Sequence, residues 1–128
     1  MQIASRQYAD TLVAAPVGRV DHLTASDLEA ELTRLIGLAR DGGSPLVLDF
    51  SDVEYISSGG LRVLMIAATQ MRSQQCKLVV AALNSVAAEI FRISRFDRVV
   101  TVSTTVEDAL EQCSSAALAA YRQSGATR

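Results

Sequence analysis

Hydrophobic and polar residues alternate at the start of the chain, and later apolar residues occur in uninterrupted runs. Ile3 to Tyr8 alternates weakly, as a half-buried strand does, and Leu12 to Val17 is expected to be a second strand. Asp10-Thr11 between them is suited to a turn, so we expect an antiparallel hairpin whose second strand ends at Gly18. The later apolar runs predict strands covered on both faces; they are Leu46 to Leu48, Lys77 to Ala82 and Val99 to Val102.

Between these runs, apolar residues recur every three or four positions, which predicts amphipathic helices. We expect Thr24 to cap the first helix, with Asp27 as its partner in a capping box; Ser26 with Glu29 is an alternative. Asp41-Gly42-Gly43 is expected to end this helix. The other expected helix starts lie near Gly59, at a cap residue Ser85, and at a capping box of Thr104 and Glu107.

Strands thus alternate with helices four times after the initial strand. This order predicts an α/β fold: a mostly parallel central sheet with right-handed crossovers, an antiparallel N-terminal strand and about four helices. No internal repeat or linker is visible, so residues 1–128 are expected to form one domain with its core at about 3–112. The last helix is expected to extend over about 113–123, before a frayed tail at 124–128.

The segment Ser57-Ser58-Gly59-Gly60 is the most informative for function, because we expect it where the strand Leu46 to Asp49 leads into a helix. One interpretation is structural, with one serine as the helix N-cap. The other is a modification site at Ser58. A phosphate there would face the positive helix end and unpaired N–H groups, and would add about −1.5 to −2 charges. A folded domain tolerates such a group locally, whereas a docked partner does not.

Catalytic interpretations of this segment are weaker. A nucleophilic serine in a Gly-x-Ser-x-Gly turn needs a glycine two residues before it, where Ile56 stands. A catalytic triad would need His22, the one histidine, which is expected in a surface loop. Gly42-Gly43 precedes a strand rather than a helix, so it does not fit a phosphate-binding loop. Direct nucleotide binding at Ser57–Gly60 is a further alternative, without a lysine, arginine cluster or metal carboxylate to complete it. We expect no enzymatic activity and no cofactor.

The composition limits the classes of partner and the cellular compartment that we expect for the protein. The formal net charge is −2, which supplies no basic surface for nucleic acid. Cys76 and Cys113 are expected to be buried thiols in a reducing compartment, and a single histidine gives no metal cluster. The first ten residues lack the pattern of a signal peptide, and no apolar run is long enough for a membrane span. We therefore expect a cytoplasmic protein.

Five segments between about Leu12 and Leu110 resemble, in order and spacing, the STAS family of anti-sigma factor antagonists. The most specific is Tyr55 to Leu64, which resembles the segment around the family's phosphorylated serine. Gly18-Arg19-Val20-Asp21 resembles its Gly-Glu-Leu-Asp segment. The remaining matches are Leu46 to Val53, Arg92 to Asp97 and Thr104 to Leu110.

This resemblance implies the STAS (SpoIIAA-like) fold and a partner-switching mechanism. The unphosphorylated antagonist would bind an anti-sigma factor that is also a serine kinase, and so release the sigma factor. The kinase would use ATP to phosphorylate the antagonist, and a PP2C-type phosphatase, which depends on a divalent metal, would reset it. The resemblance places the phosphoacceptor at Ser58 and matches Asp21 and Asp49 to acidic positions near it. We expect a monomer or a weak dimer.

Three positions depart from the family pattern. Ser57 stands where Asp is frequent, which removes a charge and makes Ser57 a rival acceptor. Gly59 replaces Ser, Thr or Ala, and because glycine is a poor helix former the helix is expected to start later. Arg95 stands where a helix-ending glycine is common, so we expect that turn to differ.

A partner is expected to contact the Arg19 to Thr24 loop, Ser57 to Gly60 and the exposed side of the following helix. Individual contact candidates are Asp21, His22, Thr24, Asp49, Ser57, Ser58, Gly59, Gly60 and Arg62, with Gln70, Arg72 and Gln74 further along. An alternative is an interaction module with a non-sigma output, such as an accessory subunit of a lipid-transport ATPase. That alternative needs no phosphorylation.

Overall fold

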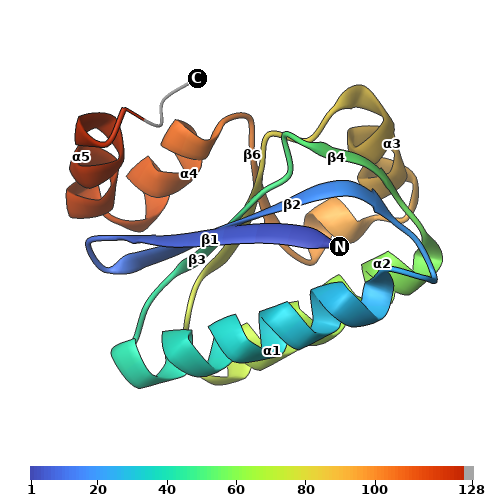
Figure 1. Cartoon of the computed structure of the whole chain (residues 1–128), viewed down its shortest axis with the longest axis horizontal. Coiled ribbons are helices and arrows are strands. Elements are labelled where there is room, and N and C mark those ends of the chain that lie inside the picture. The colour runs from blue at the N-terminus through green and yellow to red at the C-terminus, as the bar shows by residue number, and fades with distance from the viewer. Residues whose placement is uncertain (126–128) are drawn as a thin grey trace.

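A mixed sheet separates two groups of helices in the computed structural model, which describes residues 1–125 (Figure 1). The elements are β1 (Gln2–Tyr8), β2 (Thr11–Val20), α1 (Ala25–Gly42), β3 (Leu46–Asp49), β4 (Val53–Ile56), α2 (Ser58–Ser73), β5 (Leu78–Ala81), α3 (Ser85–Ile93), the 3-10 helix η1 (Phe96–Arg98), β6 (Thr101–Ser103), α4 (Val106–Cys113) and α5 (Ser115–Gln123). The described residues thus form five α-helices, where the sequence predicted about four.

The sheet has the order β1-β2-β3-β5-β6, and β4 pairs with β2 beside this path. β1 and β2 are antiparallel and close at Tyr8 and Thr11, whereas all other pairs are parallel. The predicted α/β architecture, with an antiparallel N-terminal hairpin on a parallel sheet, is confirmed. Helices α1, α2 and α3 contribute to a core on one face, and α4 and α5 to a core on the other. Residues 46–48 are fully buried because both faces are covered.

β2 does not end at Gly18 as predicted. Gly18 has a φ of +102°, and β2 continues past it to Val20. The pairing register with β4 shifts between Gly18 and Arg19, where Glu54 of β4 is the extra, unpaired residue. Glycine adopts this positive φ without a steric penalty. The extended tip of β2 pairs with β4, and β4, not the strand at residues 46–49, leads into Ser57.

Two helices begin with a cap next to the residue that the sequence pattern predicted. Asn84, not Ser85, caps α3, and its side-chain oxygen accepts a hydrogen bond from a first-turn N–H at 2.8 Å. Thr105, not Thr104, caps α4. The predicted capping box of Thr104 and Glu107 does not form, and the Thr105 hydroxyl instead accepts a hydrogen bond from the Asp108 N–H at 3.0 Å. In both places the two neighbouring residues are suitable caps, so cap preference alone does not select one of them.

The C-terminal helix is broken rather than continuous. Ser114 is extended, with φ −167° and ψ 123°, and its hydroxyl accepts a hydrogen bond from the Ala117 N–H at 3.2 Å. The ring of Tyr121 in α5 contacts the ring of Tyr8 edge-on at 5.2 Å, so α5 covers the N-terminal hairpin. Of the frayed tail expected at 124–128, residues 126–128 lie outside the described part of the chain.

The turn after α3 keeps the left-handed conformation, although we expected it to differ. Arg95 has φ 59° and ψ 24°, and η1 follows directly. Residues other than glycine are strained in this conformation, so it destabilises the turn by roughly 1 to 2 kcal/mol. The last strand accordingly begins at Thr101 and not at Val99.

No helix within residues 1–125 combines the length and the apolar character that crossing a bilayer requires.

Candidate functional site

The β4–α2 junction distinguishes the two serines that the sequence left equivalent. Ser57 occupies the cap position of α2, and its hydroxyl accepts a hydrogen bond from the Gly60 N–H at 3.2 Å. Its own N–H donates to the Val20 carbonyl at 2.7 Å. Ser58 is the first residue of the helix and is exposed. Ser57 therefore has the structural role, and Ser58 presents the accessible hydroxyl.

The two glycines of the junction differ in their surroundings. α2 already includes Gly59, so the later helix start predicted from its low helix propensity was wrong; the Ser57 cap stabilises this first turn. A Cβ on Gly59 would meet only the Ser57 hydroxyl, at an ordinary 3.6 Å. A Cβ on Gly60 would lie 2.6 Å from a Val20 methyl and 2.9 Å from an Ile56 methyl. Gly60 thus allows α2 to start directly against β2 and β4.

The loop after β2 adjoins this junction, because the N–H of Ser57 bonds to the last residue of β2. In that loop the Asp21 carboxylate accepts hydrogen bonds from the N–H groups of Leu23 at 2.9 Å and Thr24 at 3.2 Å. These bonds, the one from Leu23 foremost, lower the pKa of Asp21. The carboxylate therefore fixes the shape of the loop and stays ionised at neutral pH.

The predicted capping box of Thr24 and Asp27 does not form. Thr24 occupies the cap position of α1, but its hydroxyl donates to the Arg19 carbonyl at 2.8 Å and accepts from the Asp21 N–H at 3.0 Å. Asp27 instead binds the N-terminal amino group of Met1 at 2.7 Å. Thr24 thus holds the β2–α1 loop together and does not cap the helix with its side chain.

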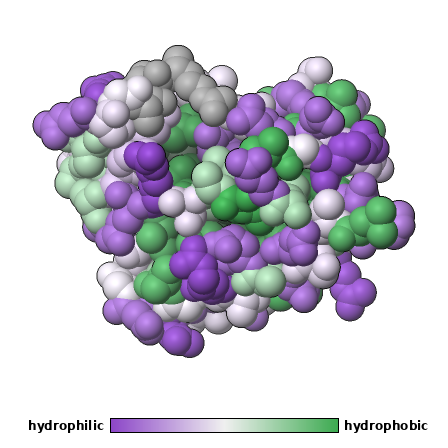
Figure 2. All heavy atoms as spheres, viewed as in Figure 1, coloured by the Kyte–Doolittle hydropathy of each residue, from purple (hydrophilic) through white to green (hydrophobic). Residues whose placement is uncertain are grey.

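The surface around Ser58 combines polar and apolar side chains. Leu23 is 74% exposed and Met65, on the Ser58 side of α2, is 42% exposed. His22 and Arg62 are exposed as well. Figure 2 shows hydrophobic atoms protruding at the right-hand end of the molecule, where Figure 1 places the β2–α1 and β4–α2 junctions. Exposed apolar side chains beside an accessible hydroxyl are suited to contact with another protein.

Asp49 does not join this site. It lies at the carboxyl end of β3, where its carboxylate accepts a hydrogen bond from the Ser51 N–H at 3.0 Å. It lines a hollow of about 160 Å³, and the rest of that lining is Ser51, Ala82, Thr104, Thr105, Val106, Glu107 and Tyr121. Neither serine of the β4–α2 junction belongs to this lining, so Asp49 and Ser58 do not share a pocket.

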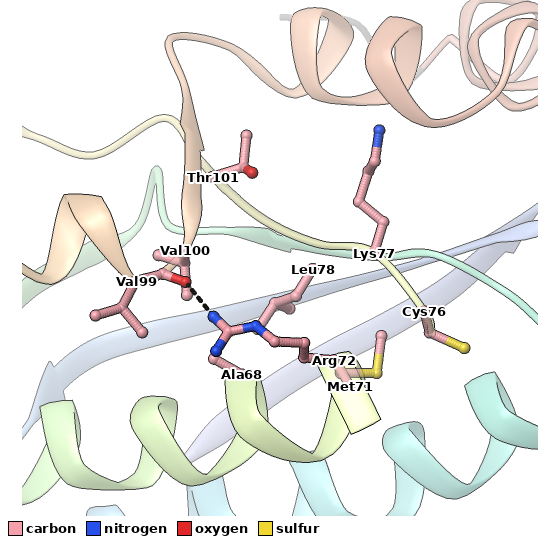
Figure 3. Close-up of a pocket in the computed structure, with 9 residues that line it drawn as sticks. All are labelled: Ala68, Met71, Arg72, Cys76, Lys77, Leu78, Val99, Val100 and Thr101. Atoms are coloured by element: carbon pink, nitrogen blue, oxygen red, sulfur yellow. Dashed lines mark hydrogen bonds between the residues drawn. The ribbon is translucent and has the colours of Figure 1, made fainter. Parts of the chain in front are cut away.

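A second cavity, of about 210 Å³, lies at the far end of α2 (Figure 3). Arg72 extends across it and donates to the Val99 carbonyl at 3.1 Å. Gln74, also considered for the contact face, donates to the Ile36 carbonyl of α1 at 2.9 Å and is partly buried. Both side chains thus hold neighbouring elements together. Because an α-helix of 16 residues is about 24 Å long, this cavity is remote from Ser58.

Residues 1–125 contain no group of three or more His, Cys, Asp or Glu side chains that could hold a metal ion. The cysteines Cys76 and Cys113 are free thiols, and they are only partly buried, whereas we expected buried thiols. Burial raises the pKa of the Cys113 thiol, which favours its neutral and unreactive form at pH 7. The junction at Ser57 and Ser58 is therefore the candidate site.

The fold and this junction define a small α/β protein whose parallel sheet presents a capped serine pair at a helix start. A family model described as the STAS domain matches residues 2–109. The chain belongs to the STAS domain family. It is 35% identical over 109 residues to BtrV of Bordetella bronchiseptica, named as a candidate anti-sigma factor antagonist, with 85% of this chain and 91% of BtrV covered.

The anti-sigma-F factor antagonist RsfB of Mycobacterium tuberculosis is 31% identical over 93 residues, which cover 73% of each chain. Among solved structures, an anti-sigma factor antagonist from Mycobacterium paratuberculosis superimposes with a TM-score of 0.76 at 22% identity, covering 88% of this chain and 94% of that chain. The Bacillus cell fate determinant SpoIIAA in its phosphorylated form gives a TM-score of 0.64 at 14% identity, covering 87% and 98%. These two structural matches show the fold.

Proposed function

We propose that this chain is an anti-sigma factor antagonist whose partner binding is switched by phosphorylation of Ser58. The observation that carries the proposal is the division of roles at the β4–α2 junction: Ser57 caps the helix, and Ser58 presents an exposed hydroxyl. Further support comes from the names of the two curated relatives, and from SpoIIAA, which shares the fold and has been solved in a phosphorylated form.

In the proposed cycle, the unphosphorylated chain binds an anti-sigma factor that is also a serine kinase, and the sigma factor is released. The docking face comprises Ser58, the loop Asp21–Thr24 and Arg62, which are grouped at one end of the sheet. Phosphorylation adds about −1.5 to −2 charges at the start of α2. The helix end stabilises this anion locally, so the fold persists while the docked partner is repelled. A PP2C-type phosphatase then removes the phosphate.

Phosphosite mapping tests the acceptor. The chain is incubated with its cognate kinase and ATP, and the phosphate is located by mass spectrometry. We expect it on Ser58 in the unmodified chain and in a Ser57→Ala variant, and we expect no phosphate in Ser58→Ala. Phosphate on neither serine of the junction would contradict the proposal, and phosphate on Ser57 alone would move the switch to the cap.

Binding measurements test the switch itself. We expect Ser58→Ala to keep the affinity for the kinase within about twofold and Ser58→Asp to weaken it roughly 10- to 100-fold, which corresponds to about 1.4 to 2.7 kcal/mol. Calorimetry with the purified partner gives both values. Equal affinities for the two variants would exclude the electrostatic mechanism. Co-purification with a transporter ATPase instead of a histidine-kinase-like ATPase would favour a non-sigma output.

A further inference from the structure

Arg62 lies one turn after Ser58 on the same side of α2, and both residues are exposed. Residues four apart on an α-helix are neighbours, with Cβ atoms roughly 5–6 Å apart. Side chains on a helix also lean toward its N-terminus, so the guanidinium of Arg62 can reach the turn that contains Ser58. A group attached to the Ser58 hydroxyl therefore comes within reach of this cation.

The guanidinium of Arg62 is not engaged elsewhere. Within residues 1–125, no ion pair and no side-chain hydrogen bond involves Arg62. Two other arginines near these elements are already engaged: Arg19 lies over the Tyr55 ring at 4.5 Å, and Arg72 donates to the Val99 carbonyl at 3.1 Å. Arg62 is thus a cation without a partner beside the proposed acceptor.

The start of α2 also lacks its own anion. Its first turn contains no acidic residue. The first N–H groups of a helix have no intrahelical acceptor, and here the Ser57 hydroxyl accepts only from the Gly60 N–H. A phosphate on Ser58 would therefore meet the free N–H groups of Ser58 and Gly59 on one side and Arg62 on the other.

We infer that Arg62 binds the phosphate of phosphorylated Ser58 and is thereby withdrawn from the docking face. The inference rests on the proposed function, because it requires phosphate at Ser58. An anion placed four residues before a cation is the favourable order on a helix, and arginine can bind phosphate with two parallel hydrogen bonds. Phosphorylation then changes the docking face in two ways: it adds a dianion, and it removes the free cation that a partner contacts.

The test measures the second ionisation of the phosphate, whose ordinary pKa is about 6. Phosphoserine is encoded genetically at position 58 of the full chain, with Arg62 or with Arg62→Gln, and the phosphorus NMR signal is titrated. Because Arg62 favours the dianion, it lowers this pKa, and we expect Arg62→Gln to raise it by about 0.3 to 0.5 unit. The difference should shrink in 1 M salt.

Neighbouring charges are controlled in the same experiment. Histidine side chains as a class change charge near this pH range, so all titrations are run in a His22→Gln background, which removes the histidine of the adjoining loop. Asp21 in that loop and Glu54 on β4 are present in both chains and act alike on the phosphate. Arg40→Gln removes an equal charge from the exposed far end of α1 and should leave the phosphate pKa unchanged. Arg62→Lys should restore part of the shift, since it keeps the charge but not the planar fork.

A phosphate pKa that is equal within about 0.1 unit with Arg62 and with Arg62→Gln would overturn the inference. So would an equal shift produced by Arg40→Gln, because the effect would then be one of net charge. The proposed function is judged separately, by partner binding of the phosphorylated and unphosphorylated chains. If the phosphorylated chain binds as tightly, the proposed function fails; if binding is lost while the phosphate pKa is unaffected by Arg62, only the inference fails.

Discussion

Two helices at the same edge of the sheet begin at a pair of adjacent hydroxyl residues, and they use the pair in different ways. Before α2 the first member, Ser57, is the cap, and Ser58 becomes the first helical residue. Before α4 the second member, Thr105, is the cap and accepts a hydrogen bond from the Asp108 N–H at 3.0 Å. Thr104 then precedes the helix. A shift of one residue therefore decides whether an exposed hydroxyl lies at the positive helix end.

The two helix starts also differ in charge and burial. The first helical residue of α4 is Val106, which is buried, whereas Ser58 is exposed. The first turn of α4 contains the acidic residues Glu107 and Asp108, whereas that of α2 contains none. Acidic side chains stabilise a helix N-terminus. The N-terminus of α4 thus has acidic side chains of its own. The N-terminus of α2 has none, so a phosphate added there is favourable.

The largest effect on stability is expected at Gly60, the third helical residue of α2. Gly60 is buried, whereas Asp108 at the same position of α4 is exposed. Gly60→Ala should destabilise the fold by roughly 1 to 3 kcal/mol, because the new methyl collides with Val20 and Ile56. Gly59→Ala is the matched control and should stabilise by up to about 1 kcal/mol, since alanine is the better helix former. Urea denaturation followed by circular dichroism measures both. A neutral Gly60→Ala would show that α2 does not start against the two strands.

The next effect concerns the two caps. Ser57→Ala and Thr105→Ala should each cost about 1 kcal/mol, because each removes the acceptor for a first-turn N–H. Ser58→Ala and Thr104→Ala, in the other position of each pair, should change stability by less than about 0.5 kcal/mol. The same denaturation experiment compares all four variants. If Ser58→Ala were the costly member of its pair, the assignment of cap and acceptor would be reversed.

The architecture was predictable where burial alone sets the pattern. The buried run at Leu46 to Leu48 and the N-terminal hairpin both form as expected. β2 is nevertheless buried on both faces at residues 12–14 and does not alternate. The extension of β2 past Gly18 was not predictable, because it depends on pairing with β4, a short and partly polar segment. Caps were misplaced by one residue for a similar reason: Thr104 and Thr105 have alike propensities, and burial of Val106 selects the second.

The site was predictable in position but not in its internal roles. The motif pointed to Ser57 and Ser58, yet only the backbone at the junction shows that Ser57 caps the helix. The need for Gly60 arises from Val20, which is distant in the sequence. The family resemblance implied that Asp49 lies near the site, but at the end of β3 it lines another hollow. Ser58 and Arg62 lie on one side of α2 because the helix begins at Ser58, earlier than the sequence predicted.

The smallest expected effect isolates the charge difference between the two helix starts. At the second helical position, Gly59→Asp should be more stable than Gly59→Asn by about 0.3 to 1 kcal/mol, because a carboxylate meets the uncompensated end of α2. Glu107→Gln at the same position of α4 should lose a similar amount, part of it from the Arg122 pair at 3.6 Å. Denaturation at low and at 1 M salt measures both differences, which salt should reduce.

This pair of variants bears directly on why a phosphate is tolerated at Ser58. The aspartate introduces a negative charge at the helix end without kinase, partner or phosphate chemistry, and the asparagine matches it in shape. A stabilising difference at Gly59 would mean that the start of α2 favours an anion by itself, so that phosphorylation alters docking while the fold is preserved. If Gly59→Asp and Gly59→Asn were equally stable at low salt, the helix end would contribute nothing. Tolerance of the phosphate would then depend on hydration and on Arg62 alone.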